Sequence, residues 1–222
     1  MSPGIGTYWF PPRWAHVIMG KMNSTGVQRF ANAKQSVECS ALTNAGGIYN
    51  EDESETMEGH GLEELAYSGC TVWTGKFSSE LKECHVTSLE GSQETGKPGV
   101  VSFDTTDELV YLDQQGTKIG YLFAGSGKRL GEMDFSGTGC AATGKQDLVG
   151  EVLAEVTPLD KEVKSVKIAF PATAKMTCWK WTLPGTLVAC ATVKLSTYGV
   201  ATTQSGEVTE ELSSKESYGP YN

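Results

Sequence analysis

Cysteine is the residue type in this chain whose number and spacing best indicate chemistry. The 222-residue sequence contains six cysteines, an even number, and no two of them form a Cys-x-x-Cys pair. This spacing lacks the ligand pattern of structural zinc sites and of thioredoxin-like redox sites. We therefore expect disulfide bonds and an extracellular or cell-surface protein, with free buried thiols as the alternative. The disulfide candidates are Cys39, Cys70, Cys84, Cys140, Cys178 and Cys190.

Two of these cysteines flank a turn signal. Cys178 and Cys190 lie on either side of Pro184-Gly185, which is typical of a β-hairpin. A two-residue loop would put the two sulfur atoms on opposite faces, whereas a three-residue loop or one bulge residue would bring them together. We predict the Cys178–Cys190 bond, because the short loop keeps the two thiols close to each other. The remaining cysteines can then pair as Cys70 with Cys84 and Cys39 with Cys140.

The three histidines give a weaker signal. His16, His60 and His85 lie far apart, without the close spacing that places two ligands or a catalytic pair on one face. We therefore predict no catalytic residue, no metal site and no cofactor. His60 has acidic neighbours in the sequence, so it is either a flexible loop residue or a pH sensor whose pKa those acids would raise.

Acidic residues concentrate in one segment. Seven of the 27 acids lie within residues 50–64, which predicts a solvated loop or the start of a short helix. An EF-hand register that begins at Asn50 fails, because Glu55 stands where glycine is needed and Gly61 where glutamate is needed. An irregular calcium site in this segment stays open. The other acids do not select a carboxylate pair for glycoside hydrolysis.

One glycine-rich segment resembles a phosphate-binding loop only superficially. Residues 125–129 read Gly-Ser-Gly-Lys-Arg, but Arg129 occupies the hydroxyl position of the P-loop and Leu122 the position of its first glycine. We predict a hairpin turn here instead. The sequence also has no Gly-x-Ser-x-Gly motif, so an α/β-hydrolase nucleophile has no support.

Two tryptophans form a candidate ligand platform. In a strand, Trp179 and Trp181 would project from one face about 6 to 7 Å apart. A flat aromatic pair at this spacing could stack on a sugar or on a protein surface. The alternative is that both indoles pack in the core, where large aromatic side chains usually lie.

The elements that must position these residues are β-strands. Short runs rich in β-branched and aromatic residues, bounded by Gly, Pro, Asp or Ser, recur from residue 66 onward. Apolar residues alternate with polar ones in 151–156 and 165–170, as in a sheet with one solvated face. We therefore predict an all-β, mainly antiparallel β-sandwich or barrel over residues 39–209. Residues 1–38 are expected to form an irregular aromatic arm, and residues 210–222 a C-terminal tail.

Charge and hydropathy exclude two classes of partner. The formal net charge is -9, which opposes the electrostatic attraction on which nucleic-acid binding depends. No run of apolar residues approaches the length of about 18 that a membrane-spanning helix needs, so we expect no membrane span. The first six residues lack the basic and apolar regions of a secretory signal. We expect either that a signal has been removed or that the protein works without export.

Several segments in the middle of the chain match a known pattern: Ser68-Gly69-Cys70, residues 84–88, residues 118–121, residues 150–161 and Phe170. On these segments the chain resembles, over about residues 39–170, a group of uncharacterised exported, β-rich proteins of soil bacteria. The group carries a cysteine two positions after the residue matching Phe135, whereas here Cys140 lies five positions after it. The resemblance implies an exported, disulfide-bonded fold and no known activity.

Together these features favour a non-catalytic extracellular or surface module with a binding or structural role. Its partner would be a carbohydrate or a protein, and it could form a homo-oligomer. A self-assembling subunit of a filament or virion is the second hypothesis. A polysaccharide-acting enzyme is the third.

Overall fold

The architecture is that of a computed structural model. It describes residues 8–9, 18–24, 26–50, 59–88, 96–158, 163–171, 175–182, 186–190, 193–212 and 219–220. All regular elements in these residues are strands, and none of these residues belongs to a helix suited to crossing a membrane. The strands are β1 (Tyr8–Trp9), β2 (Ile18–Ser24), β3 (Gln28–Asn32), β4 (Gln35–Asn50), β5 (Gly59–Thr74), β6 (Ser79–Glu80), β7 (His85–Thr87), β8 (Val100–Tyr111), β9 (Ile119–Ser136), β10 (Gly144–Thr157), β11 (Ser165–Phe170), β12 (Lys175–Met176), β13 (Trp179–Thr182), β14 (Thr186–Ala189), β15 (Val193–Thr197), β16 (Val200–Leu212) and β17 (Gly219–Pro220).

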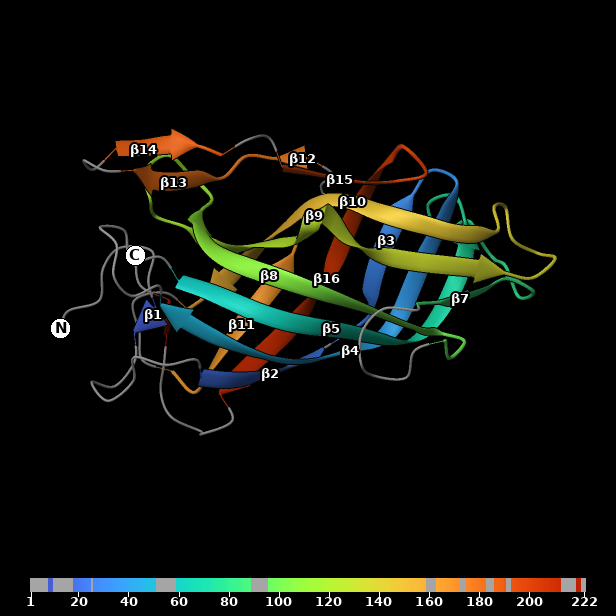
Figure 1. The fold of residues 1–222 in the computed structure, drawn as a ribbon, viewed down its shortest axis with the longest axis horizontal. Helices are drawn as coiled ribbons and strands as arrows, with labels where there is room; N and C mark the ends of the chain where they lie inside the picture. The colour runs from blue at the N-terminus through green and yellow to red at the C-terminus, as the bar shows by residue number, and fades with distance from the viewer. Residues whose placement is uncertain are drawn as a thin grey trace.

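The long strands form a sheet that closes on itself (Figure 1). The pairings run from β2 through β4, β5, β8 and β9 to β10. They continue through β11 and β16 back to β2. Every pair in this circuit is antiparallel, and consecutive long strands lie side by side. The predicted all-β, mainly antiparallel sandwich or barrel class is therefore confirmed, in the form of an irregular closed sheet.

Two places in the circuit are each filled by two short strands. β2 and β3 follow each other along β4 and β16, on either side of Gly26. β11 and β15 in the same way share the place between β10 and β16. In each of these two places, one short strand therefore pairs with one half of the neighbouring long strands and the second short strand pairs with the other half.

The inner face of the sheet holds the main hydrophobic core. Phe30, Tyr67 and Phe103 come from three strands and are at most 2% exposed. Their ring centroids lie 5.1 to 6.0 Å apart in edge-on and tilted arrangements, which add specific aromatic attraction to burial. The Gln204 side-chain amide donates a 2.8 Å hydrogen bond to the Tyr67 hydroxyl oxygen, so the buried phenol has a polar partner.

The period-2 patterns correctly predict which side chains face this core. Every second side chain along these parts of β10 and β11 packs in the main core. These residues are Val152, Ala154, Val156, Val166, Ile168 and Phe170. The intervening Leu153 is also buried, but in a second core on the outer face of the sheet. A leucine among the outward-facing residues is therefore a sign that another segment covers the sheet.

The covering segment includes the hairpin of β13 and β14. Cys178 and Cys190 pack with Val193 against Leu153 and the outward-facing Val110. Only one residue pair, Trp179 opposite Tyr111, joins β13 to the closed sheet. The hairpin is therefore attached mainly by side-chain packing and extends the sheet beyond its closed part (Figure 1).

The predicted irregular arm and tail are wrong in part. Residues 18–32 form β2 and β3 inside the closed sheet, where Met22 and Phe30 are almost fully buried. The aromatic and proline-rich composition on which the arm was predicted is confined to residues 8–14, whereas β3 alternates buried and more exposed side chains as a strand does. At the other end, β16 continues to Leu212, and β17 pairs with β1.

The predicted hairpin turn at residues 125–129 is also wrong. These residues lie within β9, which pairs with β10 on both sides of the segment. Ala124 stands opposite Glu151 and Arg129 opposite Val149, so the intervening residues form a bulge in one strand. A β-carbon on Gly125 would lie 1.7 Å from the Arg129 carbonyl oxygen, so this close backbone approach requires glycine.

Candidate functional site

Three disulfides brace the fold. They join Cys39 to Cys70, Cys84 to Cys140, and Cys178 to Cys190, and none of the cysteines is free. The predicted Cys178–Cys190 bond is confirmed. The predicted pairs Cys70–Cys84 and Cys39–Cys140 are wrong.

Strand register explains the correction. β4 pairs with β5 so that Cys39 stands directly opposite Cys70, with their Cα atoms 3.9 Å apart. Cys84 precedes β7, which pairs with β9. This pairing brings Cys84 to the loop after β9 that carries Cys140, with their Cα atoms 4.7 Å apart. Proximity in the sequence favoured Cys70 with Cys84, but β7 crosses to a different strand.

The hairpin has the odd-length connection that the third bond requires. Thr182 stands opposite Thr186, which leaves three residues between the paired ends. Counting outward in this register places Cys178 opposite Cys190, with their Cα atoms 5.1 Å apart. The Cys190 amide donates a 2.8 Å hydrogen bond to the Cys178 carbonyl oxygen and extends the ladder to the disulfide.

Of the two tryptophans in the predicted ligand platform, the structure describes the side chain of Trp179 alone. Trp179 is half-buried and packs against the main core, as the core alternative expected for it. The Trp181 side chain lies outside the described side chains, although its backbone pairs with Leu187. Lys180 between them forms an ion pair with Glu108.

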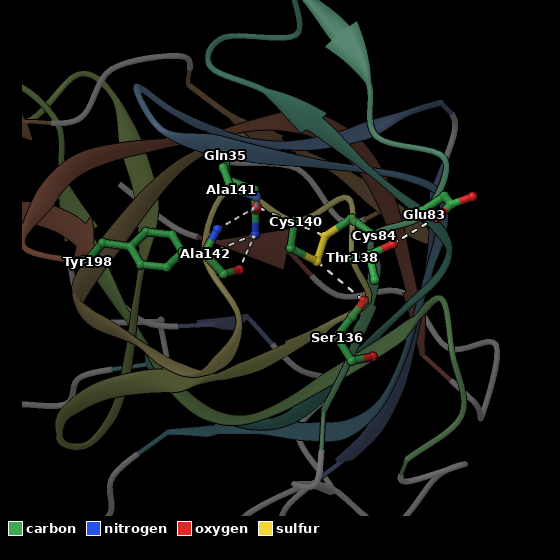
Figure 2. The surroundings of a disulfide bond; sticks show 9 residues. All are labelled: Gln35, Glu83, Cys84, Ser136, Thr138, Cys140, Ala141, Ala142 and Tyr198. Carbon is green, nitrogen blue, oxygen red and sulfur yellow. Dashed lines mark hydrogen bonds between the residues drawn. A yellow bond between two sulfur atoms is a disulfide. The ribbon is translucent and has the colours of Figure 1, made fainter.

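One end of the closed sheet is covered by the loop between β9 and β10 (Figure 2). The buried Gln35 side chain accepts hydrogen bonds of 2.8 and 3.3 Å from the Ala141 and Ala142 amides. Its own amide donates to the Ala142 carbonyl oxygen and to the Tyr198 hydroxyl. The Cys84–Cys140 disulfide lies beside this network, so a covalent bond and a buried amide together hold the loop across the sheet.

Buried carboxyl groups form the most unusual cluster inside the sheet. Glu63 on β5, Asp107 on β8 and Glu210 on β16 are 4%, 3% and 1% exposed. Asn44 donates a hydrogen bond to Glu63, and the Tyr121 hydroxyl donates one of 3.1 Å to Glu210. Carboxyl groups are almost never this deeply buried without a specific reason. These three carboxyl groups and the two polar partners are called the carboxyl cluster below.

Glycines make room for the carboxyl cluster. A β-carbon on Gly46 would lie 2.1 Å from a Glu63 carboxyl oxygen, and one on Gly61 would lie 2.1 Å from an Asp107 oxygen. Gly46 also faces the Leu62 carbonyl oxygen, 2.3 Å from such a β-carbon. Gly46 on β4 and Gly61 on β5 therefore leave space for the acids that any larger side chain would occupy.

Burial changes the acid chemistry of Glu63. Loss of hydration, followed by the nearby charges of Glu210 and Asp107, raises the pKa of Glu63 from 4.5 to about 10, while the Asn44 hydrogen bond acts in the opposite direction. Glu63 is therefore protonated at neutral pH and can donate a hydrogen bond. No group of three or more His, Cys, Asp or Glu side chains among the described residues has the arrangement of a metal site.

This cluster was not predicted from the sequence. Glu63 and Glu64 were assigned to an acidic loop or short helix, whereas both lie in β5 and Glu63 points inward. Residues 51–58 of that segment, and with them most of the open calcium site, lie outside the described residues. The alternation of buried residues along β5 was the available signal, because it aligns Glu63 with Leu65 and Tyr67.

His60 belongs to the same strand and is not in a flexible loop. Its ring stacks on Tyr49 of β4, with centroids 5.6 Å apart and an interplanar angle of 27°. The two residues are directly opposite each other in the β4–β5 ladder. The ring contact therefore contradicts only the flexible-loop alternative for His60.

An open groove lies on the outer face of the sheet over β5 and β8. Its volume is about 590 Å³. Leu62, 52% exposed, contributes apolar surface, and Glu64 stands directly opposite Asp104 across the two strands. The groove therefore presents an acidic and partly apolar surface to a partner.

We expect Gly46→Ala to destabilise the protein by about 1–3 kcal/mol, because the added methyl group overpacks the carboxyl cluster and meets backbone. Gly26→Ala is the matched control, since a β-carbon there meets no atom within 4 Å. Urea unfolding of both variants measures the effect. Equal stability of the two variants would show that the cluster is not tightly packed.

Comparison with known proteins gives no relative: no family model, no curated protein and no solved structure matches the chain.

Proposed function

We propose that this protein is a non-catalytic extracellular or surface module with a binding or structural role. The observation that carries the proposal is the set of three disulfides that braces the closed antiparallel sheet. Disulfides form and persist in oxidising compartments, which supports an extracellular or cell-surface location. A carbohydrate or a protein is the expected partner, since the net charge of -9 opposes binding to nucleic acid.

The hairpin of β13 and β14 and the outer groove are the two surfaces best suited to contacts. The hairpin lies outside the closed circuit, is fixed by its own disulfide and exposes Val188 to 42%. The groove exposes Leu62 between acidic residues. A rigid scaffold that presents such surfaces lowers the entropy cost of binding.

The competing proposal is a polysaccharide-acting enzyme, because the carboxyl cluster contains more than one acid. Glycoside hydrolysis uses two carboxyl groups that face the substrate, one of them with a raised pKa. Glu63 and Asp107 satisfy the chemical requirement, but both point into the core and are at most 4% exposed. Their burial supports a structural role for the cluster and a non-catalytic role for the protein.

Polysaccharide binding and cleavage measured on the same samples test the proposal. The oxidised protein is incubated with a panel of insoluble polysaccharides, and retained protein and released reducing ends are both quantified. We expect no release of reducing ends. Release that Glu63→Gln abolishes would contradict the proposal and establish an enzyme.

Binding to a sugar array tests whether the partner is a carbohydrate. Loss of specific binding in Trp179→Ala combined with Trp181→Ala would support the tryptophan platform, provided that circular dichroism shows that the fold is retained. Unchanged binding by the double variant would remove the tryptophan platform from the proposal.

A further inference from the structure

We infer that two copies of this chain associate through the exposed edge of β14, which pairs antiparallel with β14 of the second copy. The inference rests on the proposed binding or structural role and names its surface and its partner. The evidence is the position of β14 in the sheet, the chemistry of its side chains, and the distribution of charge along the chain.

β14 is the last strand at one end of the sheet (Figure 1). Among the described strands it pairs only with β13, and the Cys190–Cys178 hydrogen bond sets the alternation, so the backbone groups of Leu187 and Ala189 point away from β13. Natural proteins protect such edges with short strands, charges, proline or a covering segment, because an unprotected edge pairs with another chain. Two other described edge strands of the large sheet follow this rule: β6 and β12 have two residues each and carry Glu80 and Lys175.

β14 is twice as long as these two strands and lacks their charged residues. Its sequence is Thr-Leu-Val-Ala, with no charge and no proline. Thr186, Val188 and Ala189 are exposed, and Leu187 is half-buried. An uncharged edge with a β-branched residue at its centre is suited to strand addition, in which backbone hydrogen bonds hold the partner.

The charge distribution favours a second copy as that partner. The chain carries a net charge of -9, so two copies repel each other over most of their surfaces. Between Glu162 and Glu207, however, the sequence contains five lysines and no acid. The hairpin lies within this stretch, and its Lys180 is paired with Glu108, so copies that meet at β14 face little like charge. Antiparallel pairing of identical strands is also compatible with two-fold symmetry, the commonest arrangement of homo-oligomers.

The edge is also rigidly held. The Cys178–Cys190 disulfide closes the hairpin, and the two sulfur-bearing residues pack on Val110, Leu122 and Leu153. A strand that is already fixed in its bound shape loses little conformational entropy when it pairs.

A pair of matched valine variants tests the inference. Val188 on β14 is 42% exposed and Val149 on β10 is 46% exposed, but Val149 has strand neighbours on both sides. We expect oxidised wild-type protein to have twice the chain mass by light scattering and native mass spectrometry. Val188→Lys is expected to lose the dimer, because two lysines would face each other at the paired edge, whereas Val149→Lys is expected to keep it.

Hydrogen exchange gives a second readout that does not depend on a variant. The Leu187 and Ala189 amides should become more protected as the wild-type concentration rises, while amides at the β6 edge should not change. Circular dichroism checks that both lysine variants are folded.

Three results would overturn the inference. They are a wild-type monomer at every concentration, equal loss of the dimer in both valine variants, and a dimer that Val188→Lys leaves intact. A monomer that binds a carbohydrate or another protein would overturn self-association while leaving the proposed binding role in place. Release of reducing ends from a polysaccharide would instead contradict the proposed function itself.

Discussion

The double variant Cys84→Ser with Cys140→Ser should lose about 4 kcal/mol of its free energy of unfolding. This disulfide spans 56 residues, and cross-linking a long loop removes more conformational entropy from the unfolded chain than cross-linking a short one. The bond also holds the β9–β10 loop beside the Gln35 network across one end of the sheet. Its loss therefore acts on both the unfolded and the folded state.

The matched control is Cys178→Ser with Cys190→Ser, because that disulfide spans only 12 residues. We expect a smaller loss, about 3 kcal/mol, from the same loop-entropy relation. Urea unfolding under non-reducing conditions compares the two variants with the wild type. A larger loss from the short-loop variant would mean that local packing, and not loop length, determines how much each bond contributes.

Glu63→Gln should change how stability depends on pH. The pKa of Glu63 is about 10 in the folded protein, while the unfolded chain has the ordinary value of 4.5. The folded state therefore binds the proton more tightly, and the free energy of unfolding falls as pH rises between these two values. The contribution of this group is roughly 1 kcal/mol for each pH unit. Glutamine mimics the protonated acid and removes this contribution.

Unfolding measured from pH 5 to pH 9 tests the prediction. The difference between Glu63→Gln and the wild type should be small at pH 5 and should grow in favour of the variant toward pH 9. Glu64→Gln is the control, because that side chain lies on the outer face one residue away. A difference that stays constant with pH would show that Glu63 ionises normally in the folded protein.

The disulfide of the β13–β14 hairpin could be predicted from the sequence because its contacts are local. The Cys178–Cys190 bond was predicted from a turn signal and side-chain alternation, and the three-residue connection is one of the two solutions that this reasoning allowed. The other two bonds depend on which strands pair over longer distances. Nothing local to Cys84 indicates that β7 pairs with β9, so the nearest cysteine in the sequence was the wrong partner.

The carboxyl cluster depends on a similar long-range arrangement. Glu63 sits among acids that composition assigns to solvent, and only the alternation along β5 marks it as inward-facing. Its neighbours Asp107 and Glu210 come from β8 and β16, which the sequence does not place beside it. Closure of the sheet brings the three together, whereas composition describes each segment alone.

Disulfide mapping of protein taken from its native source tests most directly the claim that this is an extracellular, disulfide-braced module. Alkylation without reductant, followed by proteolysis and mass spectrometry, should find the three linkages Cys39–Cys70, Cys84–Cys140 and Cys178–Cys190 and no alkylated cysteine. Six alkylated thiols in the folded native protein would contradict the account.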